Sequence, residues 1–464
     1  MSHSPNKPKR IHFLGIGGSG MSGLAEVLIN MDFEVSGVDL IETEVTQRLK
    51  SLGAKIYLGH KKSNINNVDM LIVSSAIDNK NEELIEAKKR NLPTLARAEL
   101  LSSLMNLKKG IAIAGTHGKT TTTSILAQIM TDFGLEPTFI TGGIINSFAT
   151  NAKLGSGEYL IAEADESDKS FLMLQPSLAV ITNIEEDHLS NYENNFDKLK
   201  EAFVEFVKKI PFDGLVVACG DDFNTKSLLP RFSRRVLTYG FQESNDFVIK
   251  SFKANGKSCS FSVFNKERGD MEFNLNMLGR HNALNAVAAI VVALDEGVEI
   301  EDIKNSLKQF SGIGRRMEVM GNIKLNDKNT LLIDDYGHHP TEIKSTYLSI
   351  KESYPDSEVV MVFQPHRYTR TKELFNEFLD VLSEVDKVLL LDIYSAGEDP
   401  IDGISGEIFS KKLAERTKKP KLLVKEEDLI NSLNKEIQSE NTILLMQGAG
   451  TISSLTQKLL KEYS

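Results

Sequence analysis

Residues 11–23, IHFLGIGGSGMSG, run from a short apolar segment into glycines with the spacing Gly-x-Gly-x-x-Gly. In dinucleotide-binding folds, glycines at this spacing join a strand to a helix and bring backbone N–H groups up to a diphosphate. An acidic residue, Asp39, ends the next apolar segment about 20 residues further on, where such folds place a carboxylate that binds a ribose. The stretch therefore predicts a strand, a loop and a helix that bind a nucleotide diphosphate, with NAD as one candidate.

Apolar segments of strand length alternate with segments of helix length along almost the whole chain. They read IHFLG, EVSGV, DMLIVSS, KGIAIAG, YLIAEAD, SLAVITNI, TLLIDD, EVVMVFQ, KVLLLDI and TILLMQG. This alternation predicts parallel sheets covered by helices, which is an α/β fold. Around residues 235–277, shorter alternating segments with turn residues between them predict a few antiparallel strands.

A second glycine loop lies in residues 111–126, IAIAGTHGKTTTTSIL, between a predicted strand and a predicted helix. This context is typical of a P-loop, whose backbone N–H groups surround the phosphates of ATP. In such a loop Lys119 reaches the phosphates and the hydroxyl of Thr120 binds Mg²⁺. The residues expected at the phosphates are Gly115, Thr116, His117, Gly118, Lys119, Thr120 and Thr121.

Acidic residues follow the next apolar segment, where a P-loop protein needs a partner for its magnesium ion. The run EADESD contains Glu163, Asp165, Glu166 and Asp168, and His188 follows the strand after it. Carboxylate oxygens are ligands that Mg²⁺ prefers, whereas imidazole is an unusual one. A solvated acidic loop and a structural histidine are the alternative interpretations.

The length of 464 residues predicts about three domains, each with its own hydrophobic core. The second glycine loop begins just after Lys108 and Lys109, and a segment rich in glycine and charge precedes the last α/β series. We therefore expect a Rossmann-like domain at residues 1–107, a central P-loop domain at residues 108–316 and a second Rossmann-like domain at residues 317–464. The central domain should combine a parallel sheet with a small antiparallel sheet.

Composition excludes several classes of protein. The formal charge of −10 argues against a nucleic acid as principal partner. The two cysteines, Cys219 and Cys259, do not form a CxxC pair, so a disulfide or zinc framework is not expected and a reducing cytoplasm fits. The N-terminal residues are polar and contain no apolar core of a signal peptide, so no targeting segment is expected, and no apolar run reaches the length of about 18 residues that a membrane span needs.

Taken together, several motifs resemble those of the Mur ligases, the ATP-dependent amide-forming enzymes of bacterial cell-wall assembly. The motifs are AGTHGKTTT, EADESD and TNIEEDH in this order, GRHNALNA at 279–286, the arginine pair at 315–316 and DDYGHHP at 334–340. The resemblance is strongest to the members that attach L-alanine to UDP-N-acetylmuramate. The motifs behind this are GIGGSGMSGLAE, SSAI at 74–77, RAE at 97–99, FQPHRYTRT at 363–371 and SAGE at 395–398.

The resemblance implies which residues hold the two nucleotides. The first loop would bind the diphosphate of UDP-N-acetylmuramate rather than NAD, through Gly15, Gly17, Gly18, Ser19, Gly20, Met21, Ser22, Asp39, Ser74 and Arg97. Besides the P-loop, ATP would contact His281, Asn282, Asn285, Arg316 and Asp335. The catalytic residues would be Lys119, Glu163, His188 and Arg316, with two Mg²⁺ ions held by Thr120, Glu163 and His188. Helix capping is an alternative role for Asn282.

The resemblance also implies a site for the amino acid. Arg367 and Arg370 are three residues apart, and a guanidinium group matches a carboxylate. They would form the L-alanine site together with Tyr336, His338 and His366. A zinc site built on these histidines is the alternative. Several relatives carry a carbamylated lysine where this chain has Phe203, so that modification is not expected here.

The activity implied is the formation of an acyl phosphate on the lactyl carboxylate, which the amine of L-alanine then attacks. The nearest alternative is the recycling ligase that attaches a ready-made tripeptide to the same nucleotide sugar. More distant alternatives are a regulator that binds both nucleotides without ligation and an NAD-dependent oxidoreductase. We expect a cytoplasmic monomer or dimer that acts on small molecules and binds neither nucleic acid nor membrane.

Overall fold

The computed structural model describes residues 8–419 and 421–463, without the side chains of Ser19 and Lys421. The expected role of the Ser19 side chain therefore lies outside the described residues. The chain divides into two compact units. Unit 1 runs to Ser251 and includes Phe261–Phe273 and Leu284–Ser311, and unit 2 comprises Phe252–Ser260, Asn274–Ala283 and the chain from Gly312 onward.

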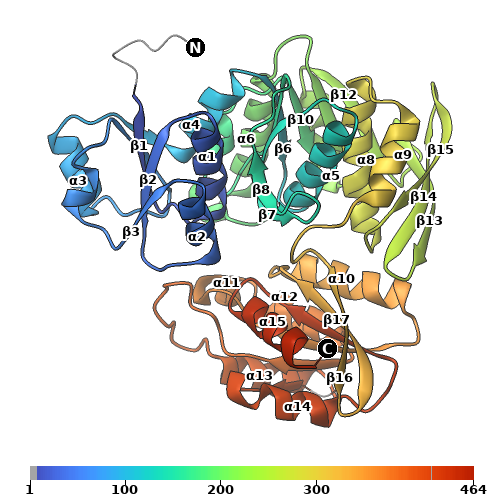
Figure 1. Ribbon diagram of the computed structural model, residues 1–464. Helices are drawn as coiled ribbons and strands as arrows, with labels where there is room; N and C mark the ends of the chain where they lie inside the picture. Colours follow the sequence, from blue (N-terminus) through green and yellow to red (C-terminus); the bar gives the residue numbers. More distant parts are fainter. Residues whose placement is uncertain (1–7, 420, 464) are drawn as a thin grey trace. The chain divides into compact units, whose positions relative to one another are not determined.

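The first sheet is parallel and has the strand order β3-β2-β1-β4-β5 (Figure 1). Its strands are β1 (Arg10–Leu14), β2 (Glu34–Asp39), β3 (Lys55–Leu58), β4 (Met70–Val73) and β5 (Thr94–Ala96). Its helices are α1 (Ser19–Asn30), α2 (Glu44–Ser51), η1 (Lys62–Ile65), α3 (Glu82–Lys89) and α4 (Arg97–Met105). The order reverses between β1 and β4, so the loops that follow these strands border the crevice where such sheets bind ligands.

The second sheet has the strand order β15-β14-β13-β12-β11-β10-β6-β9-β7-β8. Its strands are β6 (Lys109–Ala114), β7 (Thr138–Ile145), β8 (Thr150–Lys153), β9 (Tyr159–Glu163), β10 (Leu178–Ile181), β11 (Leu215–Cys219), β12 (Arg235–Gly240), β13 (Phe247–Asn255), β14 (Ser258–Asn265) and β15 (Gly269–Leu275). The prediction of antiparallel strands from residue 235 was wrong at its start, because β12 pairs with β11 in parallel. The strands after β12 extend the same sheet.

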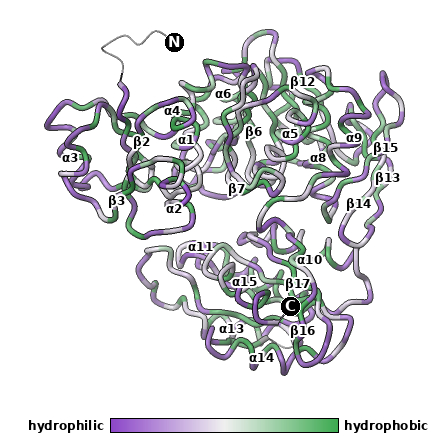
Figure 2. The backbone as a smooth tube through the Cα atoms, viewed as in Figure 1, coloured by the Kyte–Doolittle hydropathy of each residue, from purple (hydrophilic) through white to green (hydrophobic). Residues whose placement is uncertain are grey.

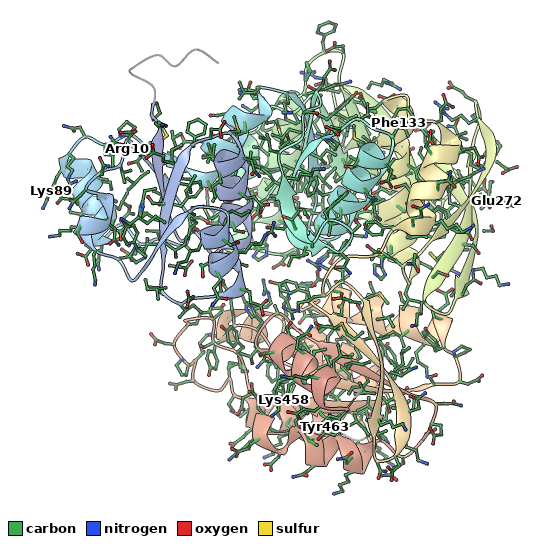
Figure 3. The ribbon with its side chains drawn as sticks, in the orientation of Figure 1. Arg10, Lys89, Phe133, Glu272, Lys458 and Tyr463 are labelled. Atoms are coloured by element: carbon green, nitrogen blue, oxygen red, sulfur yellow. The ribbon has the colours of Figure 1, made fainter. Side chains whose placement is uncertain are left out.

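Helical segments lie between and after the strands of the second sheet along the chain. They are α5 (Lys119–Asp132), η2 (Ser170–Met173), η3 (Leu189–Tyr192), α6 (Phe196–Lys208), α7 (Phe223–Leu228), η4 (Leu229–Arg231), α8 (Arg280–Asp295) and α9 (Ile300–Gln309). Exposed and buried residues alternate along β15, where Glu272 points away from the strand (Figure 3) and Met271 and Phe273 are buried.

One hydrophobic core serves the first two sheets within unit 1. Phe13 and Leu24 belong to the same buried cluster as Ile140, Ala152 and Leu160. Helix α1 packs against β7 and β8, so the first sheet's opening helix also covers part of the second sheet. The two glycine loops are thereby held in one compact unit.

The third sheet, in unit 2, has the strand order β16-β17-β21-β18-β19-β20. Its strands are β16 (Glu318–Leu325), β17 (Lys328–Asp335), β18 (Glu358–Phe363), β19 (Lys387–Leu390), β20 (Lys421–Leu423) and β21 (Thr442–Gln447). Its helices are α10 (Pro340–Ser353), α11 (Tyr368–Glu373), α12 (Phe375–Glu384), α13 (Gly406–Arg416), η5 (Glu426–Asp428), α14 (Leu429–Glu436) and α15 (Ile452–Tyr463). β16 and β17 form an antiparallel hairpin, whereas β17 with β21, β21 with β18, β18 with β19 and β19 with β20 pair in parallel.

Strand β18 is buried on both of its faces. Val359, Met361 and Phe363 belong to one buried cluster, whereas Val360 and Val362 belong to another. The strand is therefore covered on both faces, as expected for a continuous β-branched and apolar run. Figure 2 shows that apolar stretches gather on strands and on the helices that cover them. Within the described ranges, every helix is too short or too polar to cross a bilayer.

Candidate active site

The first glycine loop joins β1 to α1 and is anchored to the end of β2. The N–H groups of Gly15 and Ile16 donate to the carbonyl oxygen of Val38, at 3.0 and 3.1 Å. Gly18 is the N-cap of α1, and none of the described side chains caps the helix there. A helix N-terminus of this kind presents backbone N–H groups to an anion. The geometry suits a diphosphate.

Asp39 orders this loop through its carboxylate. Its Oδ2 accepts a hydrogen bond from the N–H of Gly17 at 2.9 Å, and its Oδ1 accepts one from the N–H of Leu40 at 2.8 Å. Both oxygens therefore have backbone donors within the protein. A contact of Asp39 with a ribose stays a prediction.

The second glycine loop leads from β6 to α5 and is closed around its own lysine. Gly118 is the N-cap of α5, with a φ of 83°. Lys119 Nζ donates hydrogen bonds to the carbonyl oxygens of Gly115 and Thr116, at 2.5 and 3.1 Å, and to Glu166 Oε2 at 2.7 Å. The ammonium group is thus held at the centre of the loop where a P-loop binds phosphates.

The charges around Lys119 keep it protonated. Burial lowers the pKa of this lysine, but the carboxylates of Glu166 and Asp165 outweigh that effect and raise the pKa above its usual value. Burial raises the pKa of Glu166 above its usual value, whereas the ammonium of Lys119 opposes this shift and favours the carboxylate form. The positive charge on Lys119 is therefore secure at neutral pH, as phosphate binding requires.

The segment that follows β10 braces the P-loop. Asn183 Oδ1 accepts the N–H of His117 at 2.9 Å, and Asn183 Nδ2 donates to the carbonyl oxygen of His117 at 3.1 Å. The N–H of Glu185 donates to Thr116 Oγ1 at 2.9 Å. These contacts connect the motif TNIEEDH to the loop that it was expected to accompany.

The hydroxyl of Thr120 and the carboxylate of Glu163 face the same point. A β-carbon at Gly142 would lie 3.2 Å from both Thr120 Oγ1 and Glu163 Oε1. Glu163 Oε1 also accepts hydrogen bonds from Thr141 Oγ1 at 2.9 Å and from the N–H of Gly142 at 2.5 Å. Oxygen donors of this kind suit Mg²⁺, so these two residues fit a magnesium ion beside the P-loop.

A cavity of about 260 Å³ connects the two glycine loops within unit 1. It is lined by Gly18, Gly20, Met21, Leu24, Ser74, Ser75, Arg97, Leu101, Lys119, Ile140, Thr141, Gly142, Glu163 and Asp165. Arg97 links the first glycine loop to the acidic segment after β9. A β-carbon at Gly20 would lie 3.1 Å from Arg97 Nη1, while Arg97 Nη2 donates to Ser170 Oγ at 3.2 Å and is 3.8 Å from Asp165 Oδ2. The structure thus brings Gly18, Gly20, Met21, Ser74 and Arg97 together with Lys119 and Glu163.

His188 follows β10 and is the N-cap of η3. It is in a left-handed conformation with a φ of 54°, and its Nε2 is 3.3 Å from Asp187 Oδ2. His188 is not among the residues that line the cavity with Glu163. Its role as a metal ligand stays a prediction. Phe203, at the place of the carbamylated lysine of relatives, is fully buried, and its ring centroid is 5.2 Å from that of Phe171.

The residues predicted to contact ATP beyond the P-loop are divided between the units. In unit 1, Asn285 touches the P-loop, because a β-carbon at Gly118 would lie 2.4 Å from Asn285 Oδ1. In unit 2, His281 Nδ1 is 3.4 Å from Ser349 Oγ, and burial lowers the pKa of His281. Asn282 Nδ2 donates to the carbonyl oxygen of Leu278 at 2.7 Å.

Arg315 and Arg316 lie near the start of the last segment of unit 2 and are held by different contacts. Both guanidinium groups lie 5.0 Å from the ring centroid of Tyr336. Arg315 Nη2 donates to the carbonyl oxygen of Gly448 at 2.5 Å, and its Nε is 3.5 Å from Asp334 Oδ2. Arg316 has a looser ion pair, with Nη1 3.8 Å from Glu342 Oε1. The contact of Arg316 with ATP stays a prediction.

Asp335 is surrounded by donors of unit 2. Its Oδ2 accepts the N–H of Met317 at 2.9 Å. Its Oδ1 accepts from the N–H of Gly337 at 3.0 Å, from Thr346 Oγ1 at 3.1 Å and from Gln447 Nε2 at 2.6 Å. The carboxylate therefore ties the chain at Met317 to β17, α10 and β21. Its contact with ATP stays a prediction.

Three of the residues predicted to bind the amino acid, Tyr336, His338 and His366, form an aromatic cluster in unit 2. The ring of His338 lies 5.3 Å from that of Tyr336 and 5.7 Å from that of His366. Burial lowers the pKa of both histidines to about 4, and the charge of Arg370 contributes to both shifts. Both imidazoles are therefore neutral at pH 7. Arg367 is more exposed, with Nη1 3.9 Å from Glu398 Oε1.

Two residues of these sites had no assigned role in the sequence interpretation. Tyr394 stacks on His366 with ring centroids 5.5 Å apart, and the only sequence signal was its position just before the SAGE motif. Glu166 was one of four clustered acids, and nothing in their order distinguished the one that binds Lys119. Both contacts arise from segments far apart in the chain.

Three family models match consecutive parts of the chain. The model described as "Mur ligase family, catalytic domain" matches residues 10–109, "Mur ligase middle domain" matches residues 113–293 and "Mur ligase, glutamate ligase domain" matches residues 315–450. Together they account for most of the described chain.

Solved structures agree in fold. A UDP-N-acetylmuramate–alanine ligase of Thermotoga maritima is 29% identical with a TM-score of 0.83, over 98% of this chain and 99% of that chain. A murein peptide ligase of Psychrobacter arcticus is 25% identical with a TM-score of 0.72, over 98% of each chain. A MurF ligase of Thermotoga maritima in complex with ADP is 17% identical with a TM-score of 0.61, over 92% of this chain and 95% of that chain, and supports the fold alone.

Proposed function

We propose, from the premise that this chain belongs to the Mur ligase family, that it attaches L-alanine to the lactyl carboxylate of UDP-N-acetylmuramate. As a family member it is an ATP-dependent ligase of peptidoglycan biosynthesis. The choice of substrates is supported by the higher similarity to the alanine ligase, with a TM-score of 0.83, than to the murein peptide ligase, with a TM-score of 0.72.

One observation carries the proposal: a single cavity is lined by both glycine loops. The reaction must bring the carboxylate of a nucleotide sugar to the γ-phosphate of ATP, and both groups are anions. Lys119 supplies a fixed positive charge at their meeting point, and Arg97 supplies a second one beside the first loop. Neutralising and orienting two anions in this way is the main contribution that an enzyme makes to phosphoryl transfer.

In the proposed reaction the lactyl carboxylate attacks the γ-phosphate, ADP leaves, and an acyl phosphate forms. The amine of L-alanine then attacks the acyl carbon, and the tetrahedral intermediate collapses to the amide and phosphate. Mg²⁺ would neutralise phosphate charge, and Thr120 and Glu163 would hold one such ion, with His188 proposed for a second. Backbone N–H groups of the P-loop would orient the phosphates.

The amino acid would bind to the aromatic cluster of unit 2. The guanidinium groups of Arg367 and Arg370 match the carboxylate of the amino acid. The rings of His338 and His366 are neutral, so the two arginines would be the charged groups that pair with this carboxylate. A small side chain such as the methyl group of alanine distinguishes substrates by only about 1 to 3 kcal/mol. We therefore expect moderate selectivity over glycine and serine.

Phosphate release from Mg-ATP in the presence of UDP-N-acetylmuramate tests the proposal. L-alanine, the recycling tripeptide and no acceptor are compared, with Lys119→Ala as the inactive variant and Lys89→Ala, an exposed lysine of α3, as the matched control. Release that depends on L-alanine and is lost only in Lys119→Ala is the expected result. Dependence on tripeptide alone would assign the chain to recycling, and no acceptor-dependent release would contradict ligation.

A further inference from the structure

The ammonium group of Lys119 uses all of its hydrogen-bond donors inside the protein. A lysine ammonium has three N–H groups, and here they meet two P-loop carbonyl oxygens and Glu166 Oε2. The Lys119 side chain is 16% exposed and lines the cavity, whereas the Glu166 side chain is 4% exposed and does not line it. A phosphate oxygen therefore has to replace one of these three acceptors.

The carboxylate is the acceptor that matters most in this exchange. Hydrogen bonds between charged groups are about twice as strong as those between neutral groups, so Glu166 holds the ammonium more strongly than either carbonyl does. Separating a buried pair also leaves a buried carboxylate without its counter-ion, which is unfavourable. Binding of phosphates at Lys119 is therefore opposed by the Glu166 contact.

The backbone of Glu166 is anchored, so its carboxylate can follow the ammonium only as far as the side chain itself reaches. Its carbonyl oxygen accepts hydrogen bonds from the hydroxyl of Tyr192 and from the N–H of Lys169. Tyr192 is 1% exposed and contributes to the core cluster of unit 1. The backbone of Glu166 is thus anchored to the core, and its side chain reaches Lys119 from an anchored position.

We propose that Glu166 is a positioning residue that restrains Lys119 and thereby lowers the affinity of the P-loop for Mg-ATP. This inference rests on the proposed function in one respect, namely that the P-loop binds ATP. In this proposal Glu166 sets the affinity for the nucleotide, whereas Glu163 has the separate role of holding Mg²⁺. A restraint of this kind keeps the lysine charged and oriented while it limits how tightly the nucleotide is held.

Direct binding of Mg²⁺ and a non-hydrolysable ATP analogue tests the proposal without any turnover. Glu166→Gln keeps the size of the side chain and an oxygen acceptor but removes the charge, so the affinity should rise about tenfold, which corresponds to about 1.4 kcal/mol. The matched control is Glu272→Gln, which removes an exposed charge from β15 and should change the affinity less than twofold. An unchanged or weaker affinity in folded Glu166→Gln would overturn the proposal.

A double-mutant cycle separates an effect through Lys119 from a direct effect of the charge. In the Lys119→Met background, Glu166→Gln should leave the residual affinity unchanged, because the restrained ammonium is gone. If the gain persisted there, Glu166 would act on the nucleotide directly and the positioning role would be refuted. Steady-state kinetics should show the same split, with a lower KM for ATP in Glu166→Gln.

A shorter carboxylate provides a second variant in case the amide disturbs folding, which a melting curve would reveal. Glu166→Asp keeps the charge but draws it away from the ammonium, so the affinity should rise by a smaller factor, and no rise would overturn the proposal. A wild-type protein that binds the analogue but releases no phosphate with L-alanine would contradict only the acceptor assignment. A wild-type protein that binds no analogue would overturn both proposals.

Discussion

Asp334 and Asp335 are neighbours on β17 with opposite environments. All the donors around Asp335 belong to unit 2, whereas neither oxygen of Asp334 has a hydrogen-bond partner among the described residues. One carboxylate is therefore stabilised in its charged form, and the other is buried beside a single guanidinium group. Each residue leads to a separate expectation.

Replacing Asp335 by asparagine should destabilise unit 2 even without nucleotide. The new amide group would oppose the N–H of Met317, and one buried donor would lose its acceptor, at a cost of about 1 to 3 kcal/mol. Thermal unfolding without ligands measures the effect, and Asp356→Asn, at an exposed position after α10, is the control. If Asp335 acted only as a ligand of ATP, both variants would melt like the wild type.

Replacing Asp334 by asparagine should change how stability depends on pH. Burial raises the pKa of Asp334 to about 6, above the ordinary value of 3.8. The folded state therefore binds more protons than the unfolded state between these values, and stability falls as pH rises through that window, by about 3 kcal/mol for this group. Asp334→Asn lacks this loss, so its melting temperature should rise relative to the wild type between pH 4 and pH 6. A constant difference over this range would contradict the shift.

At the scale of elements, the P-loop makes the sharpest demand on one backbone position. Gly118 has a φ of 83°, and a β-carbon there would lie 2.4 Å from Asn285 Oδ1. Gly134, just after α5, has a φ of 82° but nothing within 4 Å of such an atom. A side chain would be strained by the positive φ at either glycine, but only at Gly118 would it also collide with a neighbouring residue.

Gly118→Ala should therefore lose affinity for Mg-ATP, by at least about tenfold, because Asn285 or the loop has to move and misplaced groups bind the phosphates poorly. Gly134→Ala should cost only about 1 kcal/mol of stability and leave nucleotide affinity unchanged. Equilibrium binding of Mg-ATP and melting curves for both variants check this expectation. Equal affinities in the two variants would show that the contact with Asn285 is unimportant.

The strands that could be predicted from sequence are mostly those buried on both faces. KGIAIAG, SLAVITNI and EVVMVFQ all form such strands, because their unbroken apolar pattern leaves little choice of environment. The hairpins of β7 with β8 and of β16 with β17 were not foreseen, and β12 was assigned the wrong orientation. Orientation depends on which strand lies alongside, and that partner is chosen by tertiary packing.

The parts of the candidate site that depend on a fixed spacing of residues in the sequence could be predicted. The parts that depend on contacts between distant segments could not. The two glycine loops follow from their patterns, since each pattern brings backbone N–H groups together locally. The contact of Glu166 with Lys119 and the stacking of Tyr394 on His366 are tertiary. Glu163 and Asp165 precede Glu166 in the same run and Asp168 follows it, so only the fold could select among them.

At the scale of the whole molecule, unit 1 connects two sheets through close packing of α1. A β-carbon at Gly23 would lie 3.0 Å from Ile140 Cγ2 and 3.2 Å from the β-carbon of Ala152. Nearby, Arg48 Nη2 donates to Glu26 Oε1 at 2.7 Å, and Arg48 Nη1 donates to the carbonyl oxygen of Ala149 at 3.2 Å. These contacts fix the distance between the first and the second glycine loop.

Gly23→Leu should push α1 away from β7 and β8 and so separate the two loops. A displacement of about 1 Å between reacting groups can reduce the rate about a hundredfold, so kcat should fall while binding of each nucleotide measured alone changes little. Asn30→Leu, at the exposed end of the same helix, is the matched control. Loss of single-nucleotide binding in Gly23→Leu would point to local unfolding instead.

The cavity shared by the two glycine loops also bears on inhibitor design. Because both loops line one space of about 260 Å³ inside unit 1, a single compound could carry a diphosphate mimic for the first loop and a phosphonate for Lys119, joined by a short linker. Tethering the two fragments would make the second contact intramolecular, so its avidity would exceed that of either fragment. Such a compound would reach both anchors without requiring any particular placement of unit 2.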